Sequence, residues 1–333
     1  MTFDVTHFGL YFTQADVDNA QSQRDKQEDL QSAWQWLLAS SGDVIKERKP
    51  KDKNAEPEQV IKPDLDDAGQ LINATLRYRL NNNHDAGEFA SQMLMSGFGL
   101  SDSSTLFETI TTTLLVAHAF EMLRDNLPNT EGWLARFATF TDSLSQAEAD
   151  ANTIEQFWLL ALKTASAIVL EDKSRFDEAI TSYKEIIDTQ IHPEGYFKPL
   201  SQMAETKESA FREMVLACAA LTLTAEMATH AGENLWNYEN RDVGLNTSIT
   251  YLVYYYFYPD KWRWGNDDLT EDHTQAIFAD LGAWIEISTR RVNPRGVELL
   301  LDDQRPFFNA YMGGLTTLTH FKTERPKRFG IFG

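Results

Sequence analysis

The chain has 333 residues, of which 42% are hydrophobic and 24% charged, an ordinary balance for a globular protein with a sizeable core. Its formal net charge of −20 argues against nucleic acid as a partner, because that binding depends on Lys and Arg side chains that neutralise phosphates. Cys218 is the single cysteine, which excludes an internal disulfide and a cysteine-rich zinc site, and its apolar neighbours indicate a buried, inert thiol.

The N-terminal residues, MTFDVTHFGLYFTQ, lack a basic start followed by an apolar run, so we expect no signal peptide. We also expect no membrane insertion, because no stretch of about 18 residues is both apolar and uncharged. These features predict a chain that is either cytoplasmic or trimmed. The seven histidines are scattered, and none has a second histidine at i, i+4 spacing, so the sequence indicates no metal site and no cofactor.

Helical periodicity and capping residues predict helices along most of the chain. The first is expected from Thr13 to about Ser40, where Thr13 and Asp16 have the spacing of a capping box. A polar, proline-bearing stretch follows at residues 41–63, and we interpret it as a mobile loop or lid. Further helices are predicted over residues 65–80, 86–95, 106–126, 133–144, 152–170, 174–188, 206–230, 243–258 and 273–288.

Caps mark the start of two of these helices, with Asn152 paired to Glu155 and Ser174 paired to Asp177. One segment, YLVYYYFY at residues 251–258, competes for a strand because of its aromatic content. We interpret it as helical, since every neighbouring unit is helical. The chain is therefore predicted to be all-α and to form one domain over residues 1–333.

Three segments resemble the alginate lyase superfamily, particularly its mannuronate-lyase branch. The first is HFGLYFTQAD at residues 7–16. The second is GYF at 195–197, followed by AEMA at 225–228 and GENLW at 232–236. The third is AWIE at 283–286, followed by RPF at 305–307 and MGGLT at 312–316. Their order covers nearly the whole chain, and the resemblance implies an incomplete α/α toroid of helical hairpins with a groove at one end of the helices.

Members of that superfamily cleave uronate polysaccharides by β-elimination. A base removes the proton α to the carboxylate, an acid protonates the departing glycosidic oxygen, and the charge of the carboxylate is neutralised. The resemblance implies an Asn-His pair at the start of one helix, which falls near Glu155, with Asn152 close by for the Asn role. It implies Arg and Tyr on a later helix, which fall near Lys207, Arg212 and Glu213. The expected His and Tyr are therefore absent from the matching positions.

Alternatives stay open for these candidates. Glu155 is either an acid or base in place of His, or the third residue of a capping box. Glu213 has largely apolar neighbours, so on an inward face its pKa would be raised, as a general acid needs; otherwise it forms an ion pair with Lys207 or near Arg212. Residues 82–84 read Asn-Asn-His and so reproduce the letters of the superfamily's Asn-His pair, but they fit an ordinary polar hairpin loop.

Other residues are candidates for substrate contact. Trp262 and Trp264 have the spacing of exposed aromatics on which sugars stack, although loop packing explains them equally well. His192 and Tyr196 lie in the loop before a long helix, where ligand contacts are common. His118 either lines the groove or is a core histidine.

The sequence thus predicts a polysaccharide lyase-like protein that acts on a uronate-containing polysaccharide or oligosaccharide by β-elimination. A hydrolase with Glu155 and Glu213 as its carboxylate pair is a second possibility, and a carbohydrate-binding relative without catalytic groups is a third. The net charge opposes a polyanionic substrate unless a local basic patch overrides it. The resemblance also implies a secreted or periplasmic location.

Overall fold

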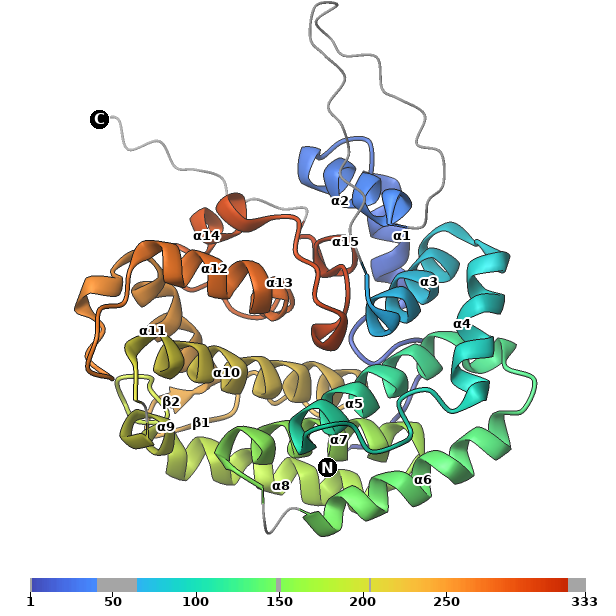
Figure 1. The fold of residues 1–333 in the computed structure, drawn as a ribbon, viewed down its shortest axis with the longest axis horizontal. Coiled ribbons are helices and arrows are strands. Elements are labelled where there is room, and N and C mark those ends of the chain that lie inside the picture. The colour runs from blue at the N-terminus through green and yellow to red at the C-terminus, as the bar shows by residue number, and fades with distance from the viewer. Residues whose placement is uncertain (1, 41–64, 148–150, 204, 323–333) are drawn as a thin grey trace, which may run out of the picture.

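The computed structural model describes residues 2–40, 65–147, 151–203 and 205–322; the expected lid at residues 41–63 lies outside them. The described part is almost entirely helical (Figure 1). Its α-helices are α1 (Gln14–Gln23), α2 (Glu28–Ala39), α3 (Asp67–Asn81), α4 (His84–Ser96), α5 (Leu106–Leu123), α6 (Thr130–Gln146), α7 (Thr153–Val169), α8 (Lys173–Gln190), α9 (Lys198–Met203), α10 (Lys207–His230), α11 (Leu245–Phe257), α12 (Glu271–Leu281), α13 (Ala283–Ser288), α14 (Val297–Gln304) and α15 (Thr316–His320). Short 3-10 turns occur at η1 (Arg124–Asn126), η3 (Pro259–Lys261) and η4 (Ala310–Met312). The strands β1 (Glu239–Asn240) and β2 (Val243–Gly244) form one small antiparallel hairpin.

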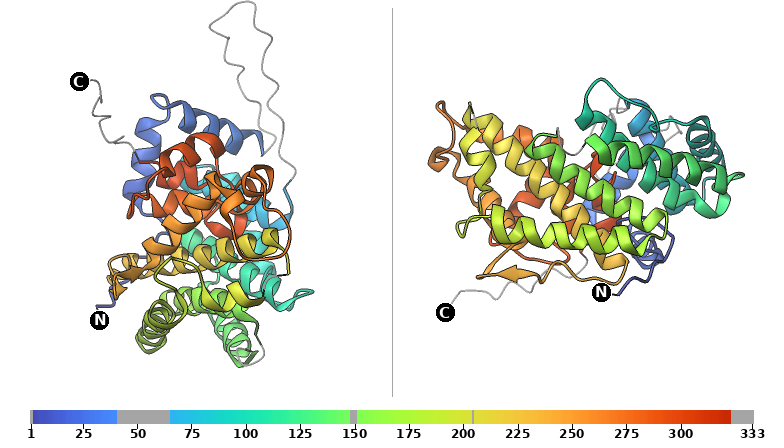
Figure 2. Two further views of the ribbon diagram at one scale, coloured as in Figure 1. Left: turned by 90° about the vertical axis from the view of Figure 1, so that its left-hand side faces the viewer. Right: turned by 90° about the horizontal axis from the view of Figure 1, so that it is seen from below.

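The helices are arranged as a ring of hairpins. Along the inner layer α3 packs on α5, α5 on α7, α7 on α10 and α10 on α13. The helices α4, α6, α8 and α11 lie outside them, and α15 packs against both α1 and α2 to bring the two ends of the chain together (Figures 1 and 2). This architecture confirms the predicted all-α toroid of helical hairpins.

The helix α5 shows why composition alone misleads about membranes. Residues Leu106–Asn126 are long and apolar enough to cross a bilayer, yet 78% of that apolar window is buried inside the protein. Neighbouring helices α3 and α7 pack along it. It is therefore a core helix of the ring, apolar all round because protein surrounds it.

Three predicted helix boundaries were wrong. The segment 13–40 forms two helices, because QSQRDKQED at residues 21–29 offers no apolar side chain to pack. The segment 273–288 is divided at Gly282, where a Cβ would lie 2.3 Å from the Phe278 carbonyl oxygen. The start of α8 is capped by Asp172, whose carboxylate accepts from the Arg175 N–H at 3.0 Å, and Ser174 lies inside the helix.

Other interpretations were correct. The aromatic segment at 251–258 is helical up to Phe257. The Asn-Asn-His run at 82–84 is the connection of a helical hairpin: Asn82 ends α3 in the left-handed conformation, Asn83 caps α4, and His84 is the first residue of α4. The Cys218 thiol is buried, and burial raises its pKa, so it is an inert core group.

The N-terminal segment closes one end of the ring. The Asp4 N–H donates to the carbonyl oxygen of Ala231 at the end of α10, at 3.0 Å. The His7 ring bonds Glu121 at 2.8 Å in the last turn of α5, and Glu171 at 3.2 Å just after α7. Three inner helices thus present their C-terminal ends to the same short segment, so their N-terminal ends lie together at the opposite end.

A buried ionic cluster joins α10 to the segment after α13. The Glu226 carboxylate is 1% exposed and accepts from Arg291 at 2.8 and 3.0 Å, and from the Trp236 indole at 3.0 Å. His230 lies 3.3 Å from the same carboxylate. Burial alone would raise the pKa of Glu226, but the bonds from His230 and Arg291 outweigh it and lower the pKa to about 2.

Because the pKa of Glu226 is depressed in the folded state, its contribution to stability is complete above its usual value of 4.5 and is lost as the pH falls toward about 2. We expect Glu226→Gln to remove on the order of 3 kcal/mol of this pH-dependent stability. The measurement is urea unfolding of both proteins across that pH range, with Glu131→Gln on the exposed face of α6 as the matched control. If the free energies of unfolding of wild type and Glu226→Gln change with pH in parallel, Glu226 is not the source of this pH-dependent stability.

Candidate functional site

The candidate site lies at the open end of the ring, where α5, α7 and α10 begin. Each of these helices has an N-cap whose side chain accepts a backbone N–H: Thr105, Asn152 and Thr206. The unpaired N–H groups of a first helical turn carry a partial positive charge that favours anionic groups. Here that charge is offset within each first turn by an acidic residue, Glu108, Glu155 or Glu208.

Asn152 and Glu155 form a complete capping box on α7. The Asn152 side chain accepts from the Ile154 and Glu155 N–H groups at 3.0 Å, and the Glu155 carboxylate accepts from the Asn152 N–H at 2.8 Å. Both side chains are thus engaged in starting the helix, which is the second of the two interpretations left open for Glu155.

This arrangement predicts a purely structural effect of substitution at position 152. We expect Asn152→Ala to lower the free energy of unfolding by about 1 kcal/mol, because an N-cap acceptor is lost. Asn152→Ser retains an acceptor and should unfold close to wild type, as measured by urea denaturation. If Asn152→Ser is as stable as wild type but no longer binds polysaccharide, Asn152 is a ligand-binding residue and the capping role is not its main one.

The first three turns of α10 carry the other catalytic candidates. Glu213 is half-buried, and burial raises its pKa; its carboxylate has no hydrogen-bond or ion-pair partner within the described ranges. Arg212 is exposed and pairs with Asp280 at 3.0 Å. Consecutive helical residues project about 100° apart, so Arg212 and Glu213 occupy neighbouring sectors of the α10 surface.

Lys207 occupies the first position of α10, against a turn from a distant loop. Its N–H donates to the Asp267 carboxylate. Gly265 has a φ of +105°, and a Cβ there would lie 2.3 Å from the Lys207 nitrogen, so only glycine allows this approach. The Lys207 ammonium forms no ion pair with any residue that the structure describes.

Aromatic rings from two loops gather beside this turn. His192 and Tyr196 stack with ring centres 4.4 Å apart, and Trp264 lies 4.7 Å from Tyr196. The Trp264 indole donates to the Tyr251 hydroxyl at 2.9 Å. The Arg263 guanidinium covers the Trp264 ring at 4.7 Å. We call His192, Tyr196 and Trp264 the groove aromatics, after the groove that the family resemblance implies; all three are half-buried, so part of each side chain is exposed.

Two of the predicted substrate contacts were wrong. Trp262 is 1% exposed, because it packs between Phe211 of α10 and Tyr255 of α11. His118 is also 1% exposed, and its Nδ1 accepts from the Leu10 N–H at 3.2 Å. Burial lowers the pKa of His118 to about 3, so it is a neutral core histidine that faces the N-terminal segment.

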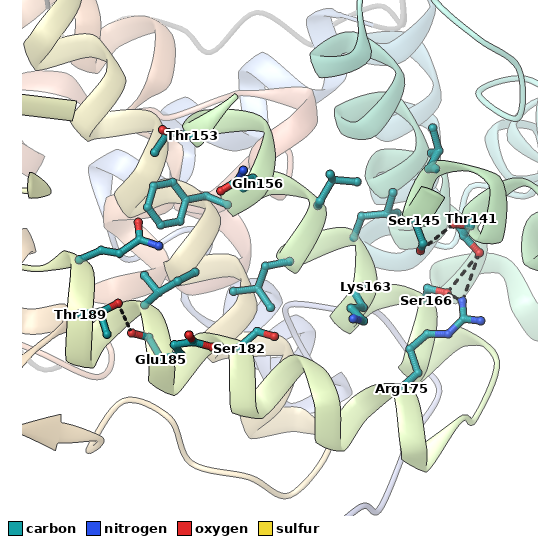
Figure 3. Close-up of a pocket in the computed structure, with 17 residues that line it drawn as sticks. Thr141, Ser145, Thr153, Gln156, Lys163, Ser166, Arg175, Ser182, Glu185 and Thr189 are labelled. Atoms are coloured by element: carbon teal, nitrogen blue, oxygen red, sulfur yellow. Dashed lines mark hydrogen bonds between the residues drawn. The ribbon is translucent and has the colours of Figure 1, made fainter. Parts of the chain in front are cut away.

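A separate cavity of about 250 Å³ lies between α6, α7 and α8, on the outer side of the ring (Figure 3). Hydroxyl and amide groups from Thr141, Thr153 and Gln156 line it. Its two cations are already paired, Arg175 with Asp142 at 2.6 Å and Lys163 with Glu178 at 3.4 Å. It contains none of the predicted site residues, so we do not place a reaction there.

The structure therefore brings together only some of the sequence-predicted residues. His192, Tyr196 and Trp264 are in ring contact, and the loop that holds Trp264 packs on Lys207. Phe197 packs on Phe157 with ring centres 5.4 Å apart, which ties this loop to the first turns of α7. Sequence inspection did not single out Arg263, Tyr251 and Asp280, which contact these candidates, or Glu194, which pairs with Arg263. Only Arg263 carried a signal, in its position between two tryptophans.

Comparison with known proteins supports the same architecture. Residues 72–262 match a protein-family model described as Alginate lyase. A variant of alginate lyase A1-III complexed with a tetrasaccharide is similar with a TM-score of 0.71 and 13% identity, over 97% of this chain and 98% of that chain. For alginate lyase A1-III from Sphingomonas species A1 the TM-score is 0.69 and the identity 14%, over 96% of this chain and 97% of that chain. For an alginate lyase from Bacteroides ovatus the TM-score is 0.63 and the identity 12%, over 96% of this chain and 100% of that chain. No curated protein matches the chain.

Proposed function

Since the chain belongs to the alginate lyase family, whose model matches more than half of it, we propose that it is a polysaccharide lyase that cleaves a uronate-containing polysaccharide by β-elimination. One observation carries this proposal. Glu213 is a half-buried carboxyl group on an inner helix, its pKa is raised by burial, and no described residue binds it. A half-buried carboxyl group whose pKa is raised can both accept a proton and return it during a reaction.

In the proposed reaction Glu213 handles both proton transfers. Its carboxylate takes the proton from the carbon next to the uronate carboxylate. The electron pair left on that carbon forms the new double bond as the bond to the glycosidic oxygen breaks. The protonated Glu213 then returns the proton to the departing oxygen, so the carboxylate is regenerated and no other reactant is consumed. One group can serve twice only if the proton and the leaving oxygen lie on the same face of the sugar.

The substrate carboxylate must be neutralised before its α proton becomes acidic enough to leave. Arg212 is proposed for this task, because it is adjacent to Glu213 on α10 and its side chain is exposed. Its pair with Asp280 is exposed on both sides, so exchanging Asp280 for the substrate carboxylate costs little. Lys207, which has no ionic partner among the described residues, would hold the carboxylate of a neighbouring sugar unit.

The groove aromatics supply the remaining contacts. The apolar faces of sugar rings pack on aromatic side chains, and the Tyr196 hydroxyl can bond sugar hydroxyls. A tetrasaccharide complex of a structural relative supports a polysaccharide as the ligand. Uronate recognition rests on Arg212 and Lys207, because the chain as a whole carries a net charge of −20.

The substrate class is tested by incubating the protein with polyuronates and neutral glycans in parallel. Ultraviolet absorbance reports unsaturated uronate ends, and a reducing-end assay reports every cleavage. We expect both signals to rise with polyuronates alone. New reducing ends without unsaturation would establish hydrolysis instead. Binding without either signal would identify a carbohydrate-binding relative that does not cleave.

A further inference from the structure

An exposed pair of tyrosines, Tyr254 and Tyr258, lies at the end of α11, beyond the groove aromatics. Large exposed hydrophobic side chains are few in the described part of the chain: Phe89, Tyr254, Phe257, Tyr258 and Leu299. Three of these five fall within five consecutive residues. Tyr254 is 42% exposed and Tyr258 is 47% exposed, and their ring centres are 4.9 Å apart with an interplanar angle of 34°. A cluster of this kind on a folded surface indicates a binding surface, whereas scattered single residues do not.

The exposed pair is continuous with the groove aromatics. Tyr254 contacts Tyr255 at 5.0 Å, Tyr255 contacts Tyr251 at 4.7 Å, and Tyr251 contacts Tyr196 at 6.1 Å between ring centres. Side chains one helical turn apart lie on the same face of α11, which explains how Tyr251, Tyr254, Tyr255 and Tyr258 form one line. We call these four residues the α11 strip.

A cation lies over the outer end of the α11 strip. The Lys261 ammonium is 4.4 Å from the centre of the Tyr258 ring and 3.1 Å from the Tyr254 hydroxyl, to which it donates. No salt bridge joins Lys261 to a carboxylate in the parts of the chain that are described. In a protein of net charge −20, this is a local positive charge placed within 5.5 Å of the centres of two exposed rings.

We propose that Tyr254, Tyr258 and Lys261 form a distal subsite for a polysaccharide chain that extends out of the groove. The rings would take the apolar faces of sugar units, and Lys261 would pair with a uronate carboxylate. The inference rests on the proposed function, because it assumes that the reacting sugar lies at the groove aromatics and that the polysaccharide continues from there along the α11 strip. It adds that a polymer binds more tightly than a short oligosaccharide that does not extend to Tyr254, Tyr258 and Lys261.

The test uses the full chain carrying Tyr254→Ala and Tyr258→Ala together. We expect its Kd for a polyuronate to rise about tenfold or more, since two ring contacts are lost. The Kd for a tetrasaccharide of the same sugar should stay unchanged. Both are measured by calorimetry and by affinity electrophoresis. Lys261→Ala should weaken polymer binding mainly at low salt.

Controls separate the subsite from general effects. Phe89→Ala removes a ring that is 43% exposed on α4, away from the strip, and should leave both affinities unchanged. Tyr254→Phe keeps the ring and should bind the polymer nearly as well as wild type. The inference is overturned if the double variant binds polymer like wild type, if Phe89→Ala weakens binding equally, or if the tetrasaccharide is affected as much as the polymer.

Binding distinguishes this inference from the proposed reaction. Strip-dependent polymer binding without cleavage would uphold the subsite and defeat the lyase proposal. Cleavage of polymer and tetrasaccharide that is indifferent to the strip would defeat the subsite and leave the lyase proposal standing. A wild-type protein that binds no polyuronate would overturn both.

Discussion

Glu213→Gln should lower kcat on a polyuronate by about two to four orders of magnitude, the usual contribution of a general acid or base. Glutamine has nearly the same shape as glutamate, but its side-chain amide can neither accept nor return a proton. The KM should change little, because the carboxyl group is assigned to proton transfer and Arg212 to binding the substrate carboxylate. Initial rates from the absorbance of unsaturated ends would give both constants.

The pH dependence of the same reaction provides an independent check. Burial raises the pKa of Glu213 above its usual 4.5, so the carboxylate that starts the reaction becomes scarce as the pH falls through the raised value. The wild-type kcat should therefore fall as the pH becomes acidic. The residual kcat of Glu213→Gln should not show this decrease. Glu131→Gln, on the exposed face of α6, is the control and should match wild type. A Glu213→Gln enzyme with wild-type kcat would remove Glu213 from the mechanism.

Arg305→Met should destabilise the fold by about 3–5 kcal/mol, as expected when one member of a buried ion pair is removed. Arg305 bonds both oxygens of Glu286, at 2.9 and 2.6 Å, and also bonds Asp29 at 2.9 Å. Glu286 is fully buried on α13 and Arg305 is 8% exposed. Methionine fills similar space but leaves the Glu286 carboxylate without its cation. Urea unfolding gives the free-energy difference.

A double variant shows whether the cost arises from the unpaired carboxylate. Arg305→Met combined with Glu286→Leu should recover part of the loss, because no uncompensated buried charge remains. Arg305→Lys should fall between wild type and Arg305→Met, since an ammonium cannot form the two parallel bonds of a guanidinium. If Arg305→Met unfolds with a free energy within about 1 kcal/mol of wild type, the pair does not stabilise the ring as described.

The fold was largely predictable because its signals are local. The spacing of Asn152 and Glu155 predicts the start of α7, and both hydrogen bonds of that capping box are present in the structure. The long helix predicted from Thr206 to His230 corresponds to α10, with Thr206 as its cap. Two of the boundaries that failed depend on tertiary packing. The break between α1 and α2 separates two buried faces, and the break at Gly282 is set by the approach of Phe278 and Phe307.

The candidate site was less predictable because its contacts are non-local. Trp262 and Trp264 look equivalent in the sequence, yet Phe211 and Tyr255 bury the first while the second remains half-buried. The partner of Arg212 is Asp280, 68 residues away, and no local pattern identifies it. The raised pKa of Glu213 could be anticipated from its apolar neighbours, because burial alone causes it.

The ratio of unsaturated ends to new reducing ends during cleavage of a polyuronate tests the proposed β-elimination most directly. β-Elimination creates one double bond for every glycosidic bond broken, so we expect a ratio of about one throughout the time course. In Glu213→Gln we expect both signals to be lost together. Reducing ends that accumulate without unsaturated ends, or a ratio of one that persists in Glu213→Gln at the wild-type rate, would contradict the proposed reaction.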